Sequence, residues 1–126
     1  MQVNEALNKA IEEIEAQFKS AGITGVKLDW WSNNDAPDVF ITFPNDIDAD
    51  GKPFINKNYD DRRFAFEINI KKIDSVESAL KEIASKVKKY ENDIYEDALC
   101  FESDEPFSDD KYKAYFEKIF QILKNK

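Results

Sequence analysis

The sequence predicts an α+β fold, in the element order α-β-β-β-α-α, with a three-stranded antiparallel sheet packed on one face by helices. Apolar residues recur at helical spacing in three segments and alternate with polar residues in three shorter ones, and no helical segment separates the shorter ones. Parallel strands need a long, usually helical crossover, so these strands are expected to pair antiparallel. The chain of 126 residues fits one domain, residues 1–126, without a linker or an internal repeat.

The first helix is expected over residues 4–21. Asn4 is a suitable N-cap, and Gly22 stands where a left-handed residue commonly ends a helix. Glutamates occupy other parts of the helical wheel. The apolar stripe expected to face the core consists of Leu7, Ala10, Ile11, Ile14 and Phe18.

Three strands are expected over residues 25–31, 38–43 and 63–70, because apolar and polar residues alternate in each. Alternation places Trp30 on the core side of the sheet and Trp31 on the other side. Residues 44–61 read as a long polar connection with a turn at its centre. The core-facing residues are Val26, Leu28 and Trp30, then Val39, Ile41 and Phe43, then Phe64, Phe66, Ile68 and Ile70.

Two more helices are expected, one long helix over residues 75–98 and a last helix capped by Ser108. Asp74 followed by Glu77 fits a capping box, and acidic residues 109 and 110 suit the first turn of the last helix. Their apolar stripes consist of Val76, Leu80, Ile83, Val87, Tyr90 and Ile94, and of Tyr112, Tyr115, Phe116, Ile119, Phe120 and Leu123.

Missing residue types exclude several kinds of catalytic site. The chain has no histidine, which removes histidine-based nucleophile systems and histidine-ligated zinc. The single cysteine, Cys100, allows neither an internal disulfide nor a structural zinc site, so a reducing cytoplasm is the expected compartment. Three glycines form no phosphate-binding loop, and no apolar run approaches the ~20 residues that span a bilayer. We therefore expect a protein that is not an enzyme, holds no cofactor and binds no membrane.

Negative charge is concentrated in one segment. The net charge is −8, and residues 91–110 contain nine acidic residues and no basic one. This charge disfavours direct binding to nucleic acid and favours a basic protein surface as the partner. The alternative is a solvated segment that only keeps the chain soluble. The residues expected to contact a partner are Glu96, Asp97, Glu102, Asp104 and Glu105, with Trp31 as an apolar anchor.

An aromatic patch is expected on the outer face of the sheet, where Trp31 and Phe40 lie on neighbouring strands. An exposed patch of this kind is typical of a binding hot spot or a dimer interface, as in a structural subunit that assembles through it. Alternatively, the long connection or the last helix covers the patch. The sequence leaves both possibilities open, and with them the oligomeric state.

Residues 46–51 resemble the first half of an EF-hand calcium loop. Asp46, Asp48 and Asp50 supply oxygen atoms at alternating positions, and Gly51 suits the sharp turn. The twelfth position, which needs a bidentate glutamate, is Lys57, and the loop lies between strands rather than helices. The three aspartates are therefore weak metal candidates, and a polar hairpin loop is the favoured interpretation.

Residues 37–71 resemble the core of the PD-(D/E)xK nucleases in the order of their elements. Asp38 begins the second strand and Glu67 lies in the third, and alternation puts both carboxylates on the outer face, as joint Mg²⁺ binding requires. The position of the family's lysine is Asn69, and Lys71 stands two residues beyond it. The resemblance implies a degenerate metal-dependent nuclease as an alternative function.

In size, acidity and element order the chain resembles small phage-encoded inhibitors of the anti-CRISPR and DNA-mimic kinds, and bacterial immunity proteins. This resemblance rests on no motif, and it implies an inhibitor or decoy that occupies a basic surface of a nucleic-acid-processing enzyme or toxin. Carboxylates at spacings near those of phosphates would compete with DNA for such a surface. A non-enzymatic acidic binding protein is thus the leading functional prediction.

Overall fold

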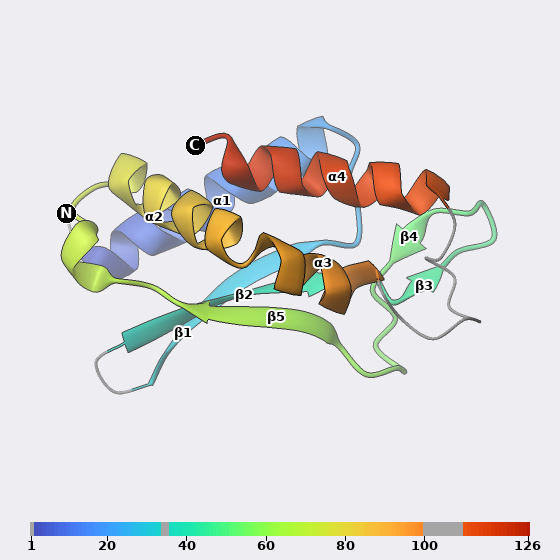
Figure 1. Ribbon diagram of the computed structural model, residues 1–126, viewed down its shortest axis with the longest axis horizontal. Coiled ribbons are helices and arrows are strands. Elements are labelled where there is room, and N and C mark those ends of the chain that lie inside the picture. The colour runs from blue at the N-terminus through green and yellow to red at the C-terminus, as the bar shows by residue number, and fades with distance from the viewer. Residues whose placement is uncertain (1, 34–35, 100–109) are drawn as a thin grey trace.

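Helices cover one face of a three-stranded antiparallel sheet, which confirms the predicted fold class (Figure 1). The computed structural model describes residues 2–33, 36–99 and 110–126. The sheet consists of β1 (Lys27–Asn33), β2 (Ala36–Phe43) and β5 (Arg62–Glu67), in the spatial order β1-β2-β5. Both strand pairs are antiparallel. The other face of the sheet, the lower one in Figure 1, carries no helix among the described elements.

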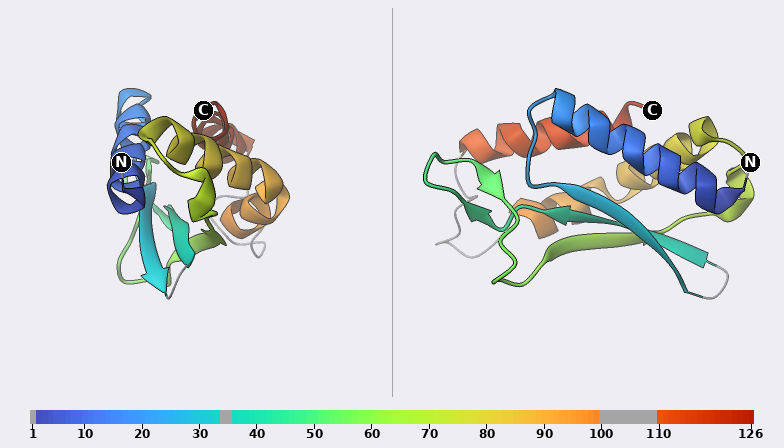
Figure 2. Two further views of the ribbon diagram at one scale, coloured as in Figure 1. Left: turned by 90° about the vertical axis from the view of Figure 1, so that its left-hand side faces the viewer. Right: turned by 180° about the vertical axis from the view of Figure 1, so that it is seen from behind.

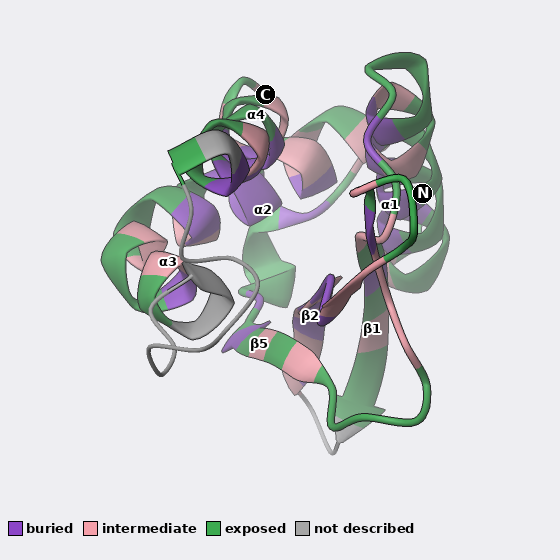
Figure 3. Ribbon diagram, turned by 90° about the vertical axis from the view of Figure 1, so that its right-hand side faces the viewer, coloured by how far each residue is buried: buried purple, intermediate pink, exposed green. Residues whose placement is uncertain are grey.

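The core lies between the inner sheet face and the helices α1 (Val3–Ser20), α2 (Val76–Lys89) and α4 (Asp110–Lys124), which pack against one another (Figure 2). Burial alternates along β2 as the period of a strand requires. The rings of Phe43 on β2 and Phe116 on α4 lie 5.9 Å apart between centroids and join sheet to helix. Figure 3 shows the buried segments facing this shared interior.

The predicted long helix over residues 75–98 is wrong, because the structure has two helices there. α2 ends at Lys89, Tyr90 leaves helical geometry with φ −104° and ψ 16°, and α3 spans Glu91–Leu99. The reason is that the two helices pack on different neighbours: α2 on α1 and α4, and α3 mainly on β5 and α4. Tyr90 marks the break and packs its ring 6.0 Å from that of Phe64.

Two predicted helix starts also differ from the structure. The capping box of α2 is formed by Ser75, whose hydroxyl accepts from the N–H of Ser78 at 3.1 Å, and by the reciprocal bond from the Ser75 N–H at 2.9 Å. Helix α1 begins one residue earlier than expected, with Gln2 at the N-cap position. Gly22 does take the left-handed conformation expected of it, with φ +72°.

The third strand is shorter than the predicted 63–70, because β5 ends at Glu67. The N–H of Asn69 donates to the carboxylate of Glu82 at 2.7 Å, and the chain then turns into a 3-10 helix, η1 (Ile70–Lys72). Ile70, predicted to be buried, is consequently 37% exposed. Glu82 is only 3% exposed, and its carboxylate takes the place of a backbone partner at the end of the strand.

The long connection between β2 and β5 contains a small hairpin at residues 46–54, where the sequence favoured a polar hairpin loop but predicted no strands. Strands β3 (Asp46–Ile47) and β4 (Pro53–Phe54) pair antiparallel. The hairpin packs closely against Gly25, where φ is +80° and a Cβ atom would lie 2.9 Å from the Cα of Phe54. Only glycine fits this position, because both its backbone conformation and the approach of β4 exclude a side chain.

Tyr115 is expected to make stability fall at alkaline pH. Its hydroxyl donates to the carbonyl of Thr24, and burial raises the pKa of Tyr115 from 10.0 to about 12. Because the folded state favours the protonated phenol, this contribution is complete below pH 10.0 and is lost as the pH rises to about 12. The free energy of unfolding of Tyr115→Phe, measured by urea denaturation, should therefore fall less across this interval than that of the unmodified chain. Parallel curves for the two proteins would contradict this assignment.

Candidate functional site

Helix α3 carries the described part of the predicted acidic surface. Asp93 and Glu96 are exposed, and α3 contains no basic residue. Among the ion pairs of the described residues, none includes Asp93 or Glu96. Of the other predicted partner-binding residues, Asp97 belongs to α3 but its side chain is outside the described part, as are residues 102, 104 and 105 entirely.

Part of the acidic segment is neutralised by the last helix. Lys124 on α4 donates to Glu91 at 2.7 Å, and this pair is the least exposed of the described ion pairs, with Lys124 20% exposed. Asp110 and Lys113 form a solvent-exposed pair at 3.6 Å, which contributes little. The Glu91 pair fastens α3 to α4 and removes one carboxylate from the free acidic surface.

Lysines gather on one flank of α2 and η1, a feature that the sequence did not predict. One cleft of about 550 Å³ is lined by Lys71, Lys86 and Lys89 together with Glu67, and a neighbouring cleft of about 310 Å³ is lined by other lysines. Lys72 and Lys81 line that second cleft, beside the buried Glu82. The sequence feature that could have indicated this flank is the group of lysines in the last turn of α2, because cations are favourable at the C-terminus of a helix. The molecule therefore carries a basic flank directly before its acidic helix.

Trp31 is exposed, which agrees with the alternative in which the aromatic patch is open rather than covered. Its side chain is 49% exposed on the outer face of β1. It does not join the acidic helix, because α3 packs beside β5, and β1 is the opposite edge strand of the sheet. Trp31 and Glu96 therefore belong to two separate surfaces rather than to one.

Three complete rows of side chains cross the outer face of the sheet. Strand register places Trp31 opposite Asp38 and Asp38 opposite Glu67, so that two carboxylates and an indole form one row. The second row has Phe40 at its centre, and the third has Thr42. The complete rows are Trp31–Asp38–Glu67, Asp29–Phe40–Ala65 and Lys27–Thr42–Arg63. The guanidinium of Arg63 lies 5.0 Å from the centroid of the Phe40 ring.

The predicted alignment of Asp38 with Glu67 is thus present, but the lysine of the nuclease pattern is not. At the family's lysine position, the Asn69 side chain accepts from the N–H of Lys71 and caps η1. Lys71 follows the end of β5 and lines the same cleft as Glu67. The fold therefore brings Asp38 beside Glu67 and places Lys71 in the cleft that Glu67 lines. Lys71 lies beyond the end of β5, whereas the nuclease pattern has its lysine on the third strand.

The calcium-like loop uses its carboxylates to close the β3–β4 hairpin. Asp48 accepts from the N–H groups of Asp50 and Lys52 at 2.9 and 2.8 Å. The side chain of Asn56 and the N–H of Ile47 both donate to Asp46 and lower the pKa of its carboxyl. Within the described ranges, no three acidic or cysteine side chains are grouped to hold a metal ion. The carboxylates of Asp46 and Asp48 thus accept hydrogen bonds within the connection itself, as a polar hairpin loop requires.

A buried asparagine, which no sequence pattern indicated, anchors the rest of the long connection. Asn45 donates to the carbonyls of Asn56 and Asp60 at 3.0 and 3.2 Å, and it accepts from the Asn56 N–H at 2.6 Å. Two segments 11 and 15 residues away are thereby held by one amide. This side chain therefore ties residues 56 and 60 of the connection to the residue that follows Pro44.

Comparison with known proteins leaves the family of the chain open. No protein-family model matches it, and neither the curated proteins nor the solved structures contain a significant match. Among the described helices, none combines the length and the apolar character that crossing a bilayer demands.

Asn45→Ala is expected to lower the free energy of unfolding by about 1–3 kcal/mol, because it removes three partly buried hydrogen bonds. Chemical denaturation followed by tryptophan fluorescence measures the change. Asn58→Ala is the matched control, since Asn58 lies exposed in the same connection and its described bond uses only its backbone N–H. Equal stability of the two variants would show that the Asn45 network does not hold the loop.

Proposed function

We propose that this chain is a non-enzymatic binding protein that uses its acidic helix α3 to occupy a basic surface of another protein. The observation that carries the proposal is that Asp93 and Glu96 are exposed on a helix without basic residues, and no described ion pair neutralises them. They belong to a segment, residues 91–110, in which nine acidic residues occur without a basic one. We place this activity in the cytoplasm, where a single unpaired cysteine is expected.

The proposed partner is a nucleic-acid-processing enzyme or a toxin with a basic groove. The field of a protein with net charge −8 would speed its encounter with such a groove, and carboxylates would then replace the phosphates that normally occupy it. Inhibition is the expected consequence, since the groove cannot hold nucleic acid at the same time. The scaffold suits this role because the Glu91–Lys124 pair fixes α3 against α4.

Reversing the exposed charges of α3 should abolish partner binding without unfolding the chain. The variant is Asp93→Lys with Glu96→Lys, two exposed positions three residues apart on one helix. Binding of the unmodified chain should weaken steeply as salt rises from about 50 to about 500 mM, because screening shortens the range of the interaction. Capture of a nuclease or toxin from lysate, followed by an inhibition assay with the purified partner, measures the effect.

The matched control is Glu12→Lys with Asp50→Lys, which changes the net charge equally at exposed positions on α1 and on the β3–β4 turn. Binding that survives the α3 reversal, or that is lost equally in the control, would show that α3 is not the contact surface. Circular dichroism confirms that each variant remains folded.

A second candidate function, a metal-dependent nuclease, is favoured by the direct pairing of Asp38 with Glu67 and by the presence of Lys71 in the cleft beside Glu67. Under this candidate, Mg²⁺ or Mn²⁺ at about 1–10 mM would support DNA cleavage, and Asp38→Asn would abolish it. Absence of both cleavage and metal-dependent spectral change would eliminate the candidate. An acidic molecule repels DNA, which is why the binding protein is preferred.

A further inference from the structure

The open face of the sheet has a charge order that the proposed function does not use. Its basic row contains Lys27 and Arg63, its acidic row contains Asp38 and Glu67, and the aromatic ring of Phe40 lies between the two rows. No described helix covers this face (Figures 1 and 2). The burial pattern confirms that all of these side chains are at least partly accessible.

The acidic row carries two like charges side by side. Asp38 and Glu67 are directly opposed across the β2–β5 pair, where Cβ atoms of neighbours lie about 5 Å apart and like charges repel. Neither carboxylate, nor Arg63, belongs to an ion pair of the described residues. The lysines of the adjoining cleft, Lys71, Lys86 and Lys89, offset part of this repulsion at Glu67, and a surface that brings more positive charge onto the row would relieve it further.

We propose that this face binds a second copy of the chain, face to face, about a two-fold axis that crosses the strands at the Phe40 row. Rotation about this axis reverses the order of the rows while it keeps each strand over its own copy. Glu67 then lies over Arg63 of the second copy, and Trp31 lies over Lys27. The two Phe40 side chains face each other across the axis, each with the Arg63 guanidinium of its own chain over its ring. Because such an interface is isologous, each of the first two contacts occurs twice.

The charge order selects this arrangement over the other face-to-face dimer. A two-fold axis parallel to the strands would place β1 over β5 and bring Lys27 onto Arg63, and Trp31 onto Glu67. That arrangement pairs like charges at the basic row. Sheets that pack face to face keep their strands within about 30° of each other, which the proposed axis allows.

The proposed dimer is weak and concentration-dependent. Rows lie about 6.7 Å apart and strands about 4.8 Å apart, so the nine positions cover much less than the roughly 800 Å² per partner of a stable interface. Asp29 lies on the axis row at the edge and meets its own copy, which opposes association. Asp29→Asn is therefore expected to strengthen the dimer.

A charge exchange tests the proposal. Sedimentation equilibrium of the full chain from about 10 µM to about 1 mM should give a monomer–dimer equilibrium, and Glu67→Arg or Arg63→Glu should each raise the dissociation constant at least about tenfold. The double variant Arg63→Glu with Glu67→Arg should restore dimerisation, because the exchange recreates both contacts with their signs reversed. Thermal melts of every variant monitor folding.

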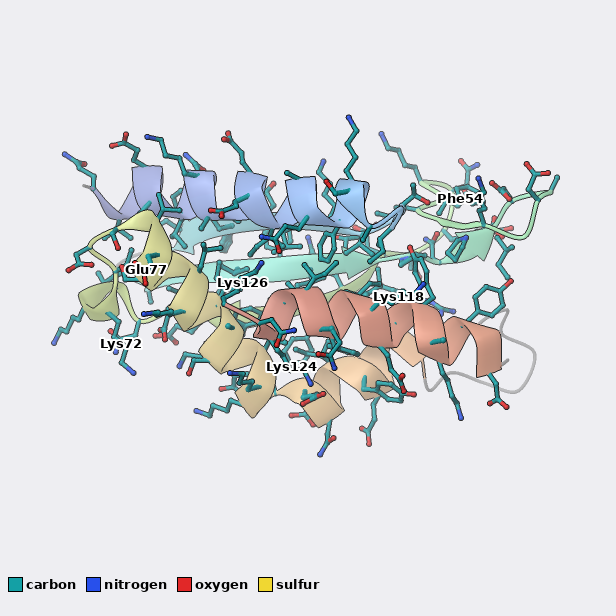
Figure 4. All side chains as sticks on the ribbon, turned by 90° about the horizontal axis from the view of Figure 1, so that it is seen from above. Phe54, Lys72, Glu77, Lys118, Lys124 and Lys126 are labelled. Carbon is teal, nitrogen blue, oxygen red and sulfur yellow. The ribbon has the colours of Figure 1, made fainter. Side chains whose placement is uncertain are left out.

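The control for Arg63→Glu is Lys118→Glu, which makes the same change of charge on α4, in the helical layer away from the open face (Figure 4). A strict monomer at the highest concentration overturns the proposal, as does a dimer that resists the single variants or is not restored by the double variant. The α3 charge reversals leave this equilibrium unchanged, so this test and that of the proposed function succeed or fail separately.

Discussion

The structure depends on the one-sided burial of a three-stranded sheet. Alternation along β2 puts Val39, Ile41 and Phe43 in the core, and helices α1, α2 and α4 close over them. Since apolar burial supplies most of the favourable free energy of folding, the inner face is fully committed to stability. The same alternation leaves the outer face free of that requirement, so its residues can carry charge and an exposed tryptophan. The separation of core and surface functions follows from the two-residue period of a strand.

Charge is arranged along the chain in the same separated way. Lysines gather in the last turns of α2 and on η1, and carboxylates follow at once in α3. Each group suits its position, because the C-terminus of a helix favours cations and the N-terminus favours anions. Because the helix breaks at Tyr90, the end of α2 forms a basic region and α3 forms an acidic region beside it. A net charge alone describes this molecule poorly, since a partner meets either a basic flank or an acidic helix.

The sequence predicted the fold class and most of the core, because these depend on periodicity that is visible residue by residue. Trp31 was placed on the outer face, and Asp38 on the same face as Glu67, for the same reason. The features that it missed depend on tertiary contacts. The break at Tyr90 follows from α3 packing on β5, the end of β5 follows from the bond to Glu82, and the anchoring of the long connection follows from the bonds of Asn45 to Asn56 and Asp60. None of these contacts produces a periodic pattern of apolar residues in the sequence.

The candidate surface was predictable in composition but not in location. Clustering of carboxylates indicated α3, yet nothing in the sequence showed that Lys124 would return to neutralise Glu91. Nor could alternation alone reveal that Trp31 and α3 lie at opposite edges of the sheet, since strand order is a property of pairing. Residue types therefore indicated the chemistry, and topology decided which residues could act together.

The contact between Gly25 and the β3–β4 hairpin limits how this chain can diverge. Since the Cα of Phe54 occupies the space of any side chain at position 25, the segment before β1 and the hairpin 29 residues later cannot change independently. A relative with a larger residue at that position is expected to have lost or displaced its hairpin. A correlated change at position 25 and in the hairpin would thus identify relatives of this chain even where the surface charges have been replaced.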